Sequence, residues 1–143
     1  ALATDILLAG DHIQLCQPEV KLATIPGWGG TQRLPALIGM GRAKQMIFSG
    51  EPISAKRAYE WGLVNEIHPL SDLMPRADEL AEQIANHAPL AVQFAKQALD
   101  TSQYRSNAMI VESLAGALSA TTRDAQEGKS AFQEKRPASF TGE

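Results

Sequence analysis

Cysteine is almost absent from this sequence of 143 residues, and Cys16 is its single copy. One cysteine excludes an internal disulfide framework and fits a reducing compartment. No apolar run is long enough to span a bilayer, and no basic-then-apolar leader opens the chain. We therefore expect a cytoplasmic protein, or a mitochondrial matrix protein if the source is eukaryotic. The chain also lacks an initial Met and starts within an apolar segment, which suggests that it has been cut from a longer one.

Positive charge is not in excess either, since 13 Lys and Arg face 16 Asp and Glu, for a formal net charge of −3. A mildly acidic chain gives no reason to expect nucleic-acid binding, because phosphate contacts need a basic surface. Hydrophobic residues make up 44% and charged residues 20%. This is an ordinary globular composition and argues against a disordered tail.

Several catalytic and ligand-binding motifs are missing as well. The histidines are scattered and no His-x-x-x-His or Cys-x-x-Cys spacing occurs, so we expect no metal site. The glycine-rich segment 27–31 has no following lysine, so it is not a phosphate-binding P-loop. No Gly-x-Ser-x-Gly elbow is present, which removes the usual signature of a serine hydrolase.

The first half of the chain predicts short strands and helices separated by turns. An apolar run over 6–9 and an alternating run over 13–16 predict two strands around Gly10-Asp11, and residues 17–30 predict a shaped loop. Thr31 is expected to cap a helix that has Pro35 near its first turn and ends at Gly39. Further elements are expected as a helix over 41–48 that Ser49-Gly50 closes, a helix that Ser54 caps and Gly62 ends, and a strand over 63–67.

The second half predicts almost only helices, with Ser71 capping the first and Pro89 opening the second. Two more are expected over about 106–120 and 123–132. Their apolar stripes are too wide to be covered within this part of the chain, so they predict contacts with another domain or subunit. We interpret residues 1–87 as part of a mixed α/β core and residues 88–143 as a helical module.

Glu19 and the loop that follows it are the main candidates for chemistry. Glu19 is either a solvated surface carboxylate or a general acid or base beside an apolar pocket. Segment 27–31 is either a tight structural turn or a set of free backbone N–H groups that hold an anion, a water or a carbonyl oxygen. Trp28 and Trp61 are expected in the core or in a pocket wall. Basic residues near the end, among them Lys129, alternate with glutamates, as on a solvated surface.

Taken in order, these segments resemble the enoyl-CoA hydratase (crotonase) family. The most specific part is the block Pro-Glu followed by Pro-Gly-x-Gly-Gly-Thr-Gln-Arg-Leu, over residues 18–34. The likeness extends over essentially the whole chain, in the segments 1–6, 17–22, 25–34, 41–44, 49–50, 53–55, 61–65, 127–132 and 134–136.

The resemblance implies an α/β fold: the C-terminal part of a crotonase-type spiral of strand–strand–helix turns over 1–87, followed by an α-helical module over 88–143 that forms trimers, often stacked as hexamers. It implies a lyase that adds water across the 2,3 double bond of an acyl-CoA thioester, as in fatty acid metabolism. No cofactor is implied, because coenzyme A is part of the substrate.

The resemblance also assigns roles to residues. Glu19 matches the glutamate that exchanges a proton with the α-carbon, and Gly27 matches a loop position whose backbone helps hold the catalytic water. Trp28, beside it, is expected to contact substrate. Phe132 and Lys135 match positions that, in some members, reach the CoA adenine of a neighbouring subunit.

One departure from the family lies at the start of the chain. By this alignment the chain is the C-terminal half of a family member. The other catalytic glutamate would lie two positions before Ala1, and the second N–H group of the oxyanion hole would lie further upstream. We therefore expect negligible hydratase activity from these 143 residues alone. Two other interpretations stay open: a different crotonase-type reaction, such as an isomerisation or a decarboxylation, and a non-catalytic oligomerisation module.

Overall fold

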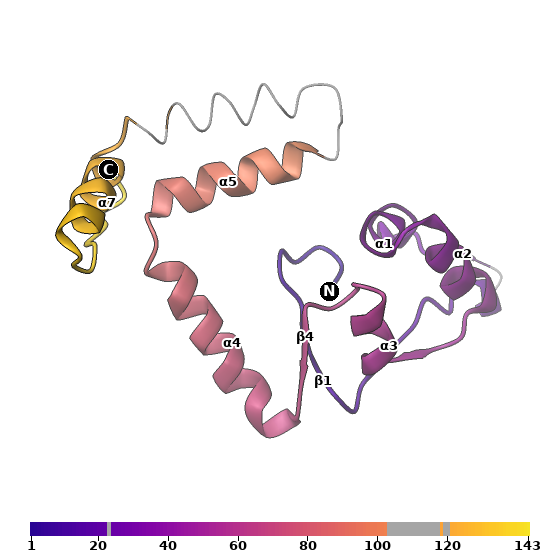
Figure 1. The fold of residues 1–143 in the computed structure, drawn as a ribbon. Coiled ribbons are helices and arrows are strands. Elements are labelled where there is room, and N and C mark those ends of the chain that lie inside the picture. The colour runs from indigo at the N-terminus through magenta and orange to yellow at the C-terminus, as the bar shows by residue number, and fades with distance from the viewer. Residues whose placement is uncertain (23, 103–117, 119–120) are drawn as a thin grey trace. The chain divides into compact units, whose positions relative to one another are not determined.

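The computed structural model describes residues 1–22, 24–102, 118 and 121–143 (Figure 1). Contacts within the chain divide it into two compact units, Ala1–Asp78 and Glu79–Glu143. The predicted roles, a spiral remainder over 1–87 and a trimerisation module over 88–143, stay predictions. Among the described helices, none has both the length and the apolar character that crossing a membrane would require.

The first unit contains two small sheets. Strand β1 (Leu8–Gly10) pairs in parallel with β4 (Glu66–His68), and β2 (Gln14–Leu15) pairs antiparallel with β3 (Ile53–Ser54). The two strands expected around Gly10-Asp11 are thus confirmed, although each pairs with a distant partner. The strand expected over 63–67 is shorter and begins later, as β4. Leu63 and Val64 precede it as buried core residues, and the Leu63 N–H donates to the carbonyl of Ala58 in α3.

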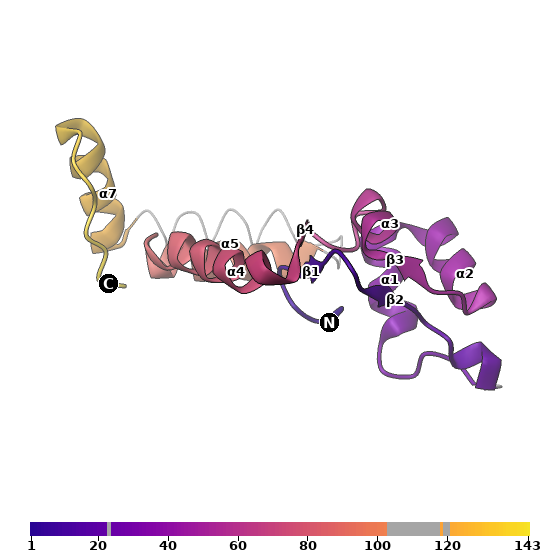
Figure 2. The same cartoon turned by 90° about the horizontal axis from the view of Figure 1, so that it is seen from below.

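Three helices complete the core of this unit: α1 (Gly30–Ile38), α2 (Met40–Ser49) and α3 (Ala55–Glu60). Helices α1 and α2 lie side by side (Figures 1 and 2). Leu34 is fully buried at the centre of an apolar cluster that spans these helices and the strands beside them. The other buried members are Ala9, Ile38, Ala43, Met46, Ile53, Ala58, Leu63 and Val64.

Several predicted helix ends are confirmed. Gly39 ends α1, and Gly50, with a φ of 61°, ends α2 by donating its N–H to the carbonyl of Met46. The Ser54 hydroxyl accepts the backbone N–H of Arg57 at 3.2 Å and so caps α3. These ends follow local rules, because a left-handed glycine and a serine cap each satisfy backbone groups that the helix leaves unpaired.

Two predicted caps are wrong. Helix α1 begins at Gly30 with Gly29 as its N-cap, so Thr31 lies inside it and Pro35 lies beyond its first turn. The backbone of Gly29, at a φ of 90°, starts the helix earlier without any side-chain cap. Helix α4 (Leu70–Ala85) includes Ser71, because the carbonyl of Pro69 already accepts the first helical N–H groups.

A partly exposed ion cluster joins β4 to the first half of α4. The Arg76 guanidinium donates to both oxygens of Glu66, at 2.8 and 2.9 Å, and His68 Nε2 lies 2.7 Å from Glu66 Oε2. The hydrogen bonds from Arg76, and then the one from His68, lower the pKa of the Glu66 carboxyl to about 2. Glu66 therefore stays ionised at all but strongly acidic pH.

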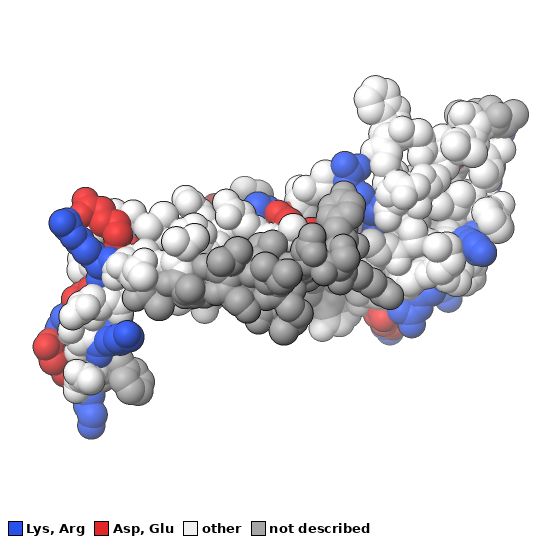
Figure 3. Space-filling view, turned by 90° about the horizontal axis from the view of Figure 1, so that it is seen from above, with Lys and Arg blue, Asp and Glu red and all other residues white. Residues whose placement is uncertain are grey.

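The second unit holds α5 (Pro89–Ser102) and α7 (Arg123–Glu134). Pro89 opens α5 and Arg123 begins α7, which confirms two of the predicted helices. The helix expected over 106–120 falls, apart from residue 118, outside the described residues. Acidic and basic side chains intermingle over α7 (Figure 3), which agrees with the solvated charged surface that the sequence predicts there.

Candidate active site

Glu19 opens a short 3₁₀ helix, η1 (Glu19–Leu22), directly after Pro18. The turn forms because the Lys21 N–H donates to the carbonyl of Pro18 at 2.9 Å. On its other side, the Lys21 ammonium pairs with Glu51 Oε1 at 2.7 Å, and its aliphatic stem lies against Gly50. These contacts fix η1 to the end of α2, and with it the backbone that carries the Glu19 side chain.

The environment of the Glu19 carboxylate is unusual for a charged side chain. Its Oε2 atom is buried, yet accepts no hydrogen bond from any residue that the structure describes. Buried polar atoms nearly always have a hydrogen-bond partner, because a buried atom without one loses its hydrogen bonds to water and gains none within the protein. An unpaired buried oxygen is therefore available to a ligand or to a transferred proton.

A hollow of about 220 Å³ adjoins Glu19, and we call it the Glu19 hollow. It is lined by Ala1, Leu2, Ala3, Gln17, Glu19, Pro26, Trp28, Gly30 and Arg33. Small and apolar side chains form much of this wall, and Glu19 supplies its carboxylate. Gln17 and Arg33 add further polar groups, so the hollow suits a small group of mixed polarity whose reacting atoms face the Glu19 carboxylate.

The glycine-rich loop shapes one side of the hollow. Gly30 is buried, and a Cβ atom there would lie 2.8 Å from both Gln17 Oε1 and Pro26 Cβ. A Cβ atom on Gly29 would lie 2.1 Å from Arg33 Nη1, which donates to the carbonyl of Trp28 at 3.0 Å. Gly30 is therefore needed for the close approach of the Pro26 ring. Gly29 is needed for its φ of 90°, because the Arg33 guanidinium is the end of a flexible side chain and could move aside.

The structure brings together only part of the predicted site. Glu19 and Trp28 line the same hollow, and the Trp28 side chain is 97% exposed, so it borders the pocket and is not in the core. Gly27 is exposed and is not among the lining residues, although its neighbours on both sides are. Whether these residues act on a substrate stays a prediction.

Sequence reasoning missed Gln17 and Arg33 as members of the site. Gln17 directly precedes the Pro-Glu pair, and Arg33 lies one turn into the helix that follows the glycines. A lone arginine in a helix gives no signal of its own. The signal that could have found it is its position four residues after Gly29, which places it one helical turn beyond the loop.

The other two predicted residues, Phe132 and Lys135, belong to the second unit. Phe132 lies in α7, and its side chain is outside the described part of the structure. Lys135 is exposed and follows the last residue of α7 with a φ of 55°. Their contact with coenzyme A stays a prediction. In the described ranges, no group of three or more His, Cys, Asp or Glu side chains is arranged to hold a metal ion.

Known proteins are similar to this chain in sequence and fold. The profile of the enoyl-CoA hydratase/isomerase family matches residues 1–143. The short-chain-enoyl-CoA hydratase of Clostridium acetobutylicum is 42% identical over 95% of this chain and 53% of its own. The 2,3-dehydroadipyl-CoA hydratase of Escherichia coli is 41% identical over 99% of this chain and 56% of its own.

A solved structure agrees with these relatives. The crystal structure of enoyl-CoA hydratase from Bacillus anthracis matches with a TM-score of 0.97 and 43% identity, over 99% of this chain and 56% of that one. This chain thus spans about half the length of the relatives that it matches, and its expected place in their C-terminal half stays a prediction. From the family profile, the identity to relatives and the shared α/β crotonase fold, it follows that the chain belongs to the enoyl-CoA hydratase/isomerase family.

Proposed function

We propose that this chain is the part of a trans-2-enoyl-CoA hydratase that carries one of its two acid/base carboxylates, Glu19. The observation that supports the proposal is the buried, unpaired Oε2 atom of Glu19 beside the Glu19 hollow. The other carboxylate and the N–H groups that polarise the thioester carbonyl come from residues outside these 143. The chain alone is accordingly expected to have negligible activity.

In the proposed reaction, the oxygen of water forms a bond to C3 of the enoyl group, and the water proton passes to the other carboxylate. Electrons of the double bond move toward the thioester carbonyl, where two backbone N–H groups stabilise the enolate-like oxygen. The protonated Glu19 then gives its proton to C2, the α-carbon. The product is a 3-hydroxyacyl-CoA, and the two carboxyl groups regain their starting states by exchange with solvent.

Trp28 and Gly27 have supporting roles in this proposal. The backbone of Gly27 helps to hold the attacking water, and the exposed indole of Trp28 covers the acyl group at the border of the hollow. The names of the relatives include both a short-chain and a dehydroadipyl substrate, so acyl-CoA thioesters are proposed as a class. No cofactor is needed, and the active assembly is proposed to be a trimer or a hexamer.

The experiment that tests this proposal is a hydration assay on the complete protein that carries the chain. Crotonyl-CoA serves as substrate, and loss of the conjugated thioester absorbance measures the rate. Glu19→Gln keeps the size of the side chain and removes the carboxylate, so kcat is expected to fall by a factor of about 10² to 10⁴. Glu60→Gln, at an exposed position of α3, is the matched control and should keep the wild-type rate.

Two results would count against the proposal. A folded Glu19→Gln protein with wild-type kcat would remove Glu19 from the chemistry. A folded wild-type protein that leaves the absorbance of crotonyl-CoA unchanged would favour another crotonase-type reaction, such as isomerisation or decarboxylation.

A further inference from the structure

The side chain of Arg33 turns back from α1 toward the loop that precedes this helix. Its Nη1 atom donates to the carbonyl of Trp28 at 3.0 Å. The guanidinium lies against Gly29, in the space that a side chain would otherwise fill, since a Cβ atom on this glycine would be 2.1 Å from Nη1. Arg33 therefore connects the helix to the main chain of the glycine-rich loop.

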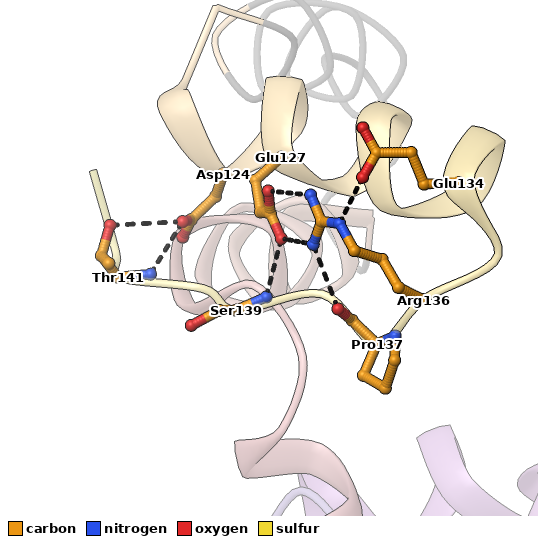
Figure 4. A network of polar contacts seen from close by, with 7 residues as sticks. All are labelled: Asp124, Glu127, Glu134, Arg136, Pro137, Ser139 and Thr141. Atoms are coloured by element: carbon orange, nitrogen blue, oxygen red, sulfur yellow. Dashed lines mark hydrogen bonds and ion pairs between the residues drawn. The ribbon is translucent and has the colours of Figure 1, made fainter.

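Ion pairs hold an arginine elsewhere in this chain, as in the network around Arg136 (Figure 4). Arg136 donates to both oxygens of Glu127, at 2.6 and 2.9 Å, and to Glu134 Oε2 at 2.6 Å. Arg33 is different, because it is exposed at the side of the Glu19 hollow and the structure shows no ion pair between it and a described residue. Its guanidinium is held by a main-chain carbonyl and not by a carboxylate.

The stability of α1 does not explain this contact. The N-terminal end of a helix carries a partial positive charge, so a guanidinium that is brought back to this end is repelled by the helix dipole. The backbone N–H of Arg33 already donates to the carbonyl of Gly29 at 2.9 Å, so the helix begins without help from the side chain. The contact therefore has its effect on the loop and not on the helix.

Trp28 is the residue of the loop that this contact holds. Its side chain is 97% exposed, and in the described part of the chain the bond from Arg33 is the one hydrogen bond that Trp28 makes. A peptide group is planar and rigid, so a fixed carbonyl also fixes the direction of the main chain from which the indole projects. Trp28 and Arg33 both line the Glu19 hollow. The orientation of the indole at the hollow thus depends on Arg33.

We propose that Arg33 is a positioning residue for the acyl group of the substrate, because it holds the main chain of Trp28 and keeps the indole at the border of the Glu19 hollow before the acyl group binds. This inference rests on the proposed function, which places the acyl group in the hollow. It adds a residue that determines how well the acyl group binds without touching the reacting atoms. When the contact is lost, Trp28 becomes ordered only on binding, and ordering one free side chain weakens affinity by about two- to tenfold.

Calorimetric titration of the complete protein with butyryl-CoA, and separately with coenzyme A, tests this proposal. Butyryl-CoA has the acyl chain of crotonyl-CoA without its double bond, so it binds without turnover. Arg33→Met should raise the Kd for butyryl-CoA by about two- to tenfold and leave the Kd for coenzyme A unchanged, because the contact acts on the acyl group alone. An unchanged Kd for butyryl-CoA, or an equal loss for both ligands as a general structural disturbance would cause, would overturn the proposal.

Arg42→Met is the matched control. Arg42 is an exposed arginine of α2 that also donates to the carbonyl of a tryptophan, Trp61, at 3.3 Å. It is not among the residues that line the Glu19 hollow, so this variant should bind both ligands as wild type does. If Arg42→Met weakens butyryl-CoA binding as much as Arg33→Met, the effect is not specific to the loop and the proposal is wrong.

A double-mutant cycle tests whether Arg33 acts through the indole. Trp28→Ala should weaken butyryl-CoA binding, and in this background Arg33→Met should have no further effect. An equal loss from Arg33→Met in both backgrounds would show that Arg33 acts without the indole and would refute the role. A protein that hydrates crotonyl-CoA, but whose Arg33→Met variant binds butyryl-CoA as wild type does, would keep the proposed function and lose only this inference.

Discussion

The loop beside Glu19 can be tested by adding a single methyl group to Gly30. This glycine is buried at the start of α1, between the Gln17 side chain and the Pro26 ring. An added Cβ atom would lie 2.8 Å from Gln17 Oε1 and from Pro26 Cβ. The Gln17 amide is the end of a flexible chain and can move aside, whereas the Pro26 ring is part of the loop backbone, so the loop itself must shift.

The expected magnitude follows from two opposing effects. Alanine in place of a helical glycine stabilises by about 0.5–1 kcal/mol, because the unfolded chain has less freedom to lose. Overpacking a filled site costs about 1–3 kcal/mol. Gly41 provides the matched control, since it also lies near the start of a helix and nothing lies within 4 Å of its added Cβ atom. The helix-propensity gain is common to both variants, so Gly30→Ala should be less stable than Gly41→Ala by about 1–3 kcal/mol.

The assay is urea unfolding of the complete protein at fixed concentration, with the midpoints of wild type, Gly30→Ala and Gly41→Ala compared. Gly41→Ala should unfold at higher urea than wild type, and Gly30→Ala at lower urea. Gly30→Ala should also lose hydration activity, because the displaced loop lines the Glu19 hollow. If the two variants shift the midpoint equally and upward, the close packing around Gly30 is refuted.

Two further predictions concern stability. Ser54→Ala should lower the free energy of unfolding by about 1 kcal/mol, because the Arg57 N–H loses its cap, whereas Ser71→Ala should change it little. Urea midpoints measure both variants, and equal losses would contradict the assignment of caps. The Glu66 pKa of about 2 lies below its ordinary value of 4.5. The Arg76 contact therefore stabilises the fold fully above pH 4.5, and this stability is lost as the pH falls toward 2. Melting temperatures measured across this window should fall less steeply in Glu66→Gln than in wild type, and identical slopes would show that the contact is not formed.

Local rules predicted the helix ends where a residue type fixes the backbone by itself. Gly39, Gly50 and Ser54 act through their own conformation or hydroxyl, and the structure confirms each. Thr31 and Ser71 are equally good cap residues, but a neighbouring residue started the helix before them. The choice between adjacent cap positions depends on the incoming backbone, which residue type alone does not determine.

Long-range features could not be predicted from local patterns. The pairing of β1 with β4 is extended by Asn65, whose side chain accepts the Leu7 N–H and whose own N–H donates to the Leu7 carbonyl. Nothing in either segment identifies the other. For Glu19 the sequence offered a surface carboxylate and a pocket carboxylate as alternatives. The buried Oε2 atom favours the pocket, and that burial depends on residues brought in by the fold.

The most direct test of the central claim, that Glu19 exchanges a proton with the α-carbon, is to run the hydration of crotonyl-CoA in heavy water with the complete protein. Deuterium at C2 of the 3-hydroxyacyl product is followed by NMR, for wild type, Glu19→Gln and the Glu60→Gln control. Wild type and control should place deuterium at C2 at the rate of hydration, and Glu19→Gln should lose both by a factor of about 10² or more. A folded Glu19→Gln protein that still deuterates C2 at the wild-type rate would contradict the claim.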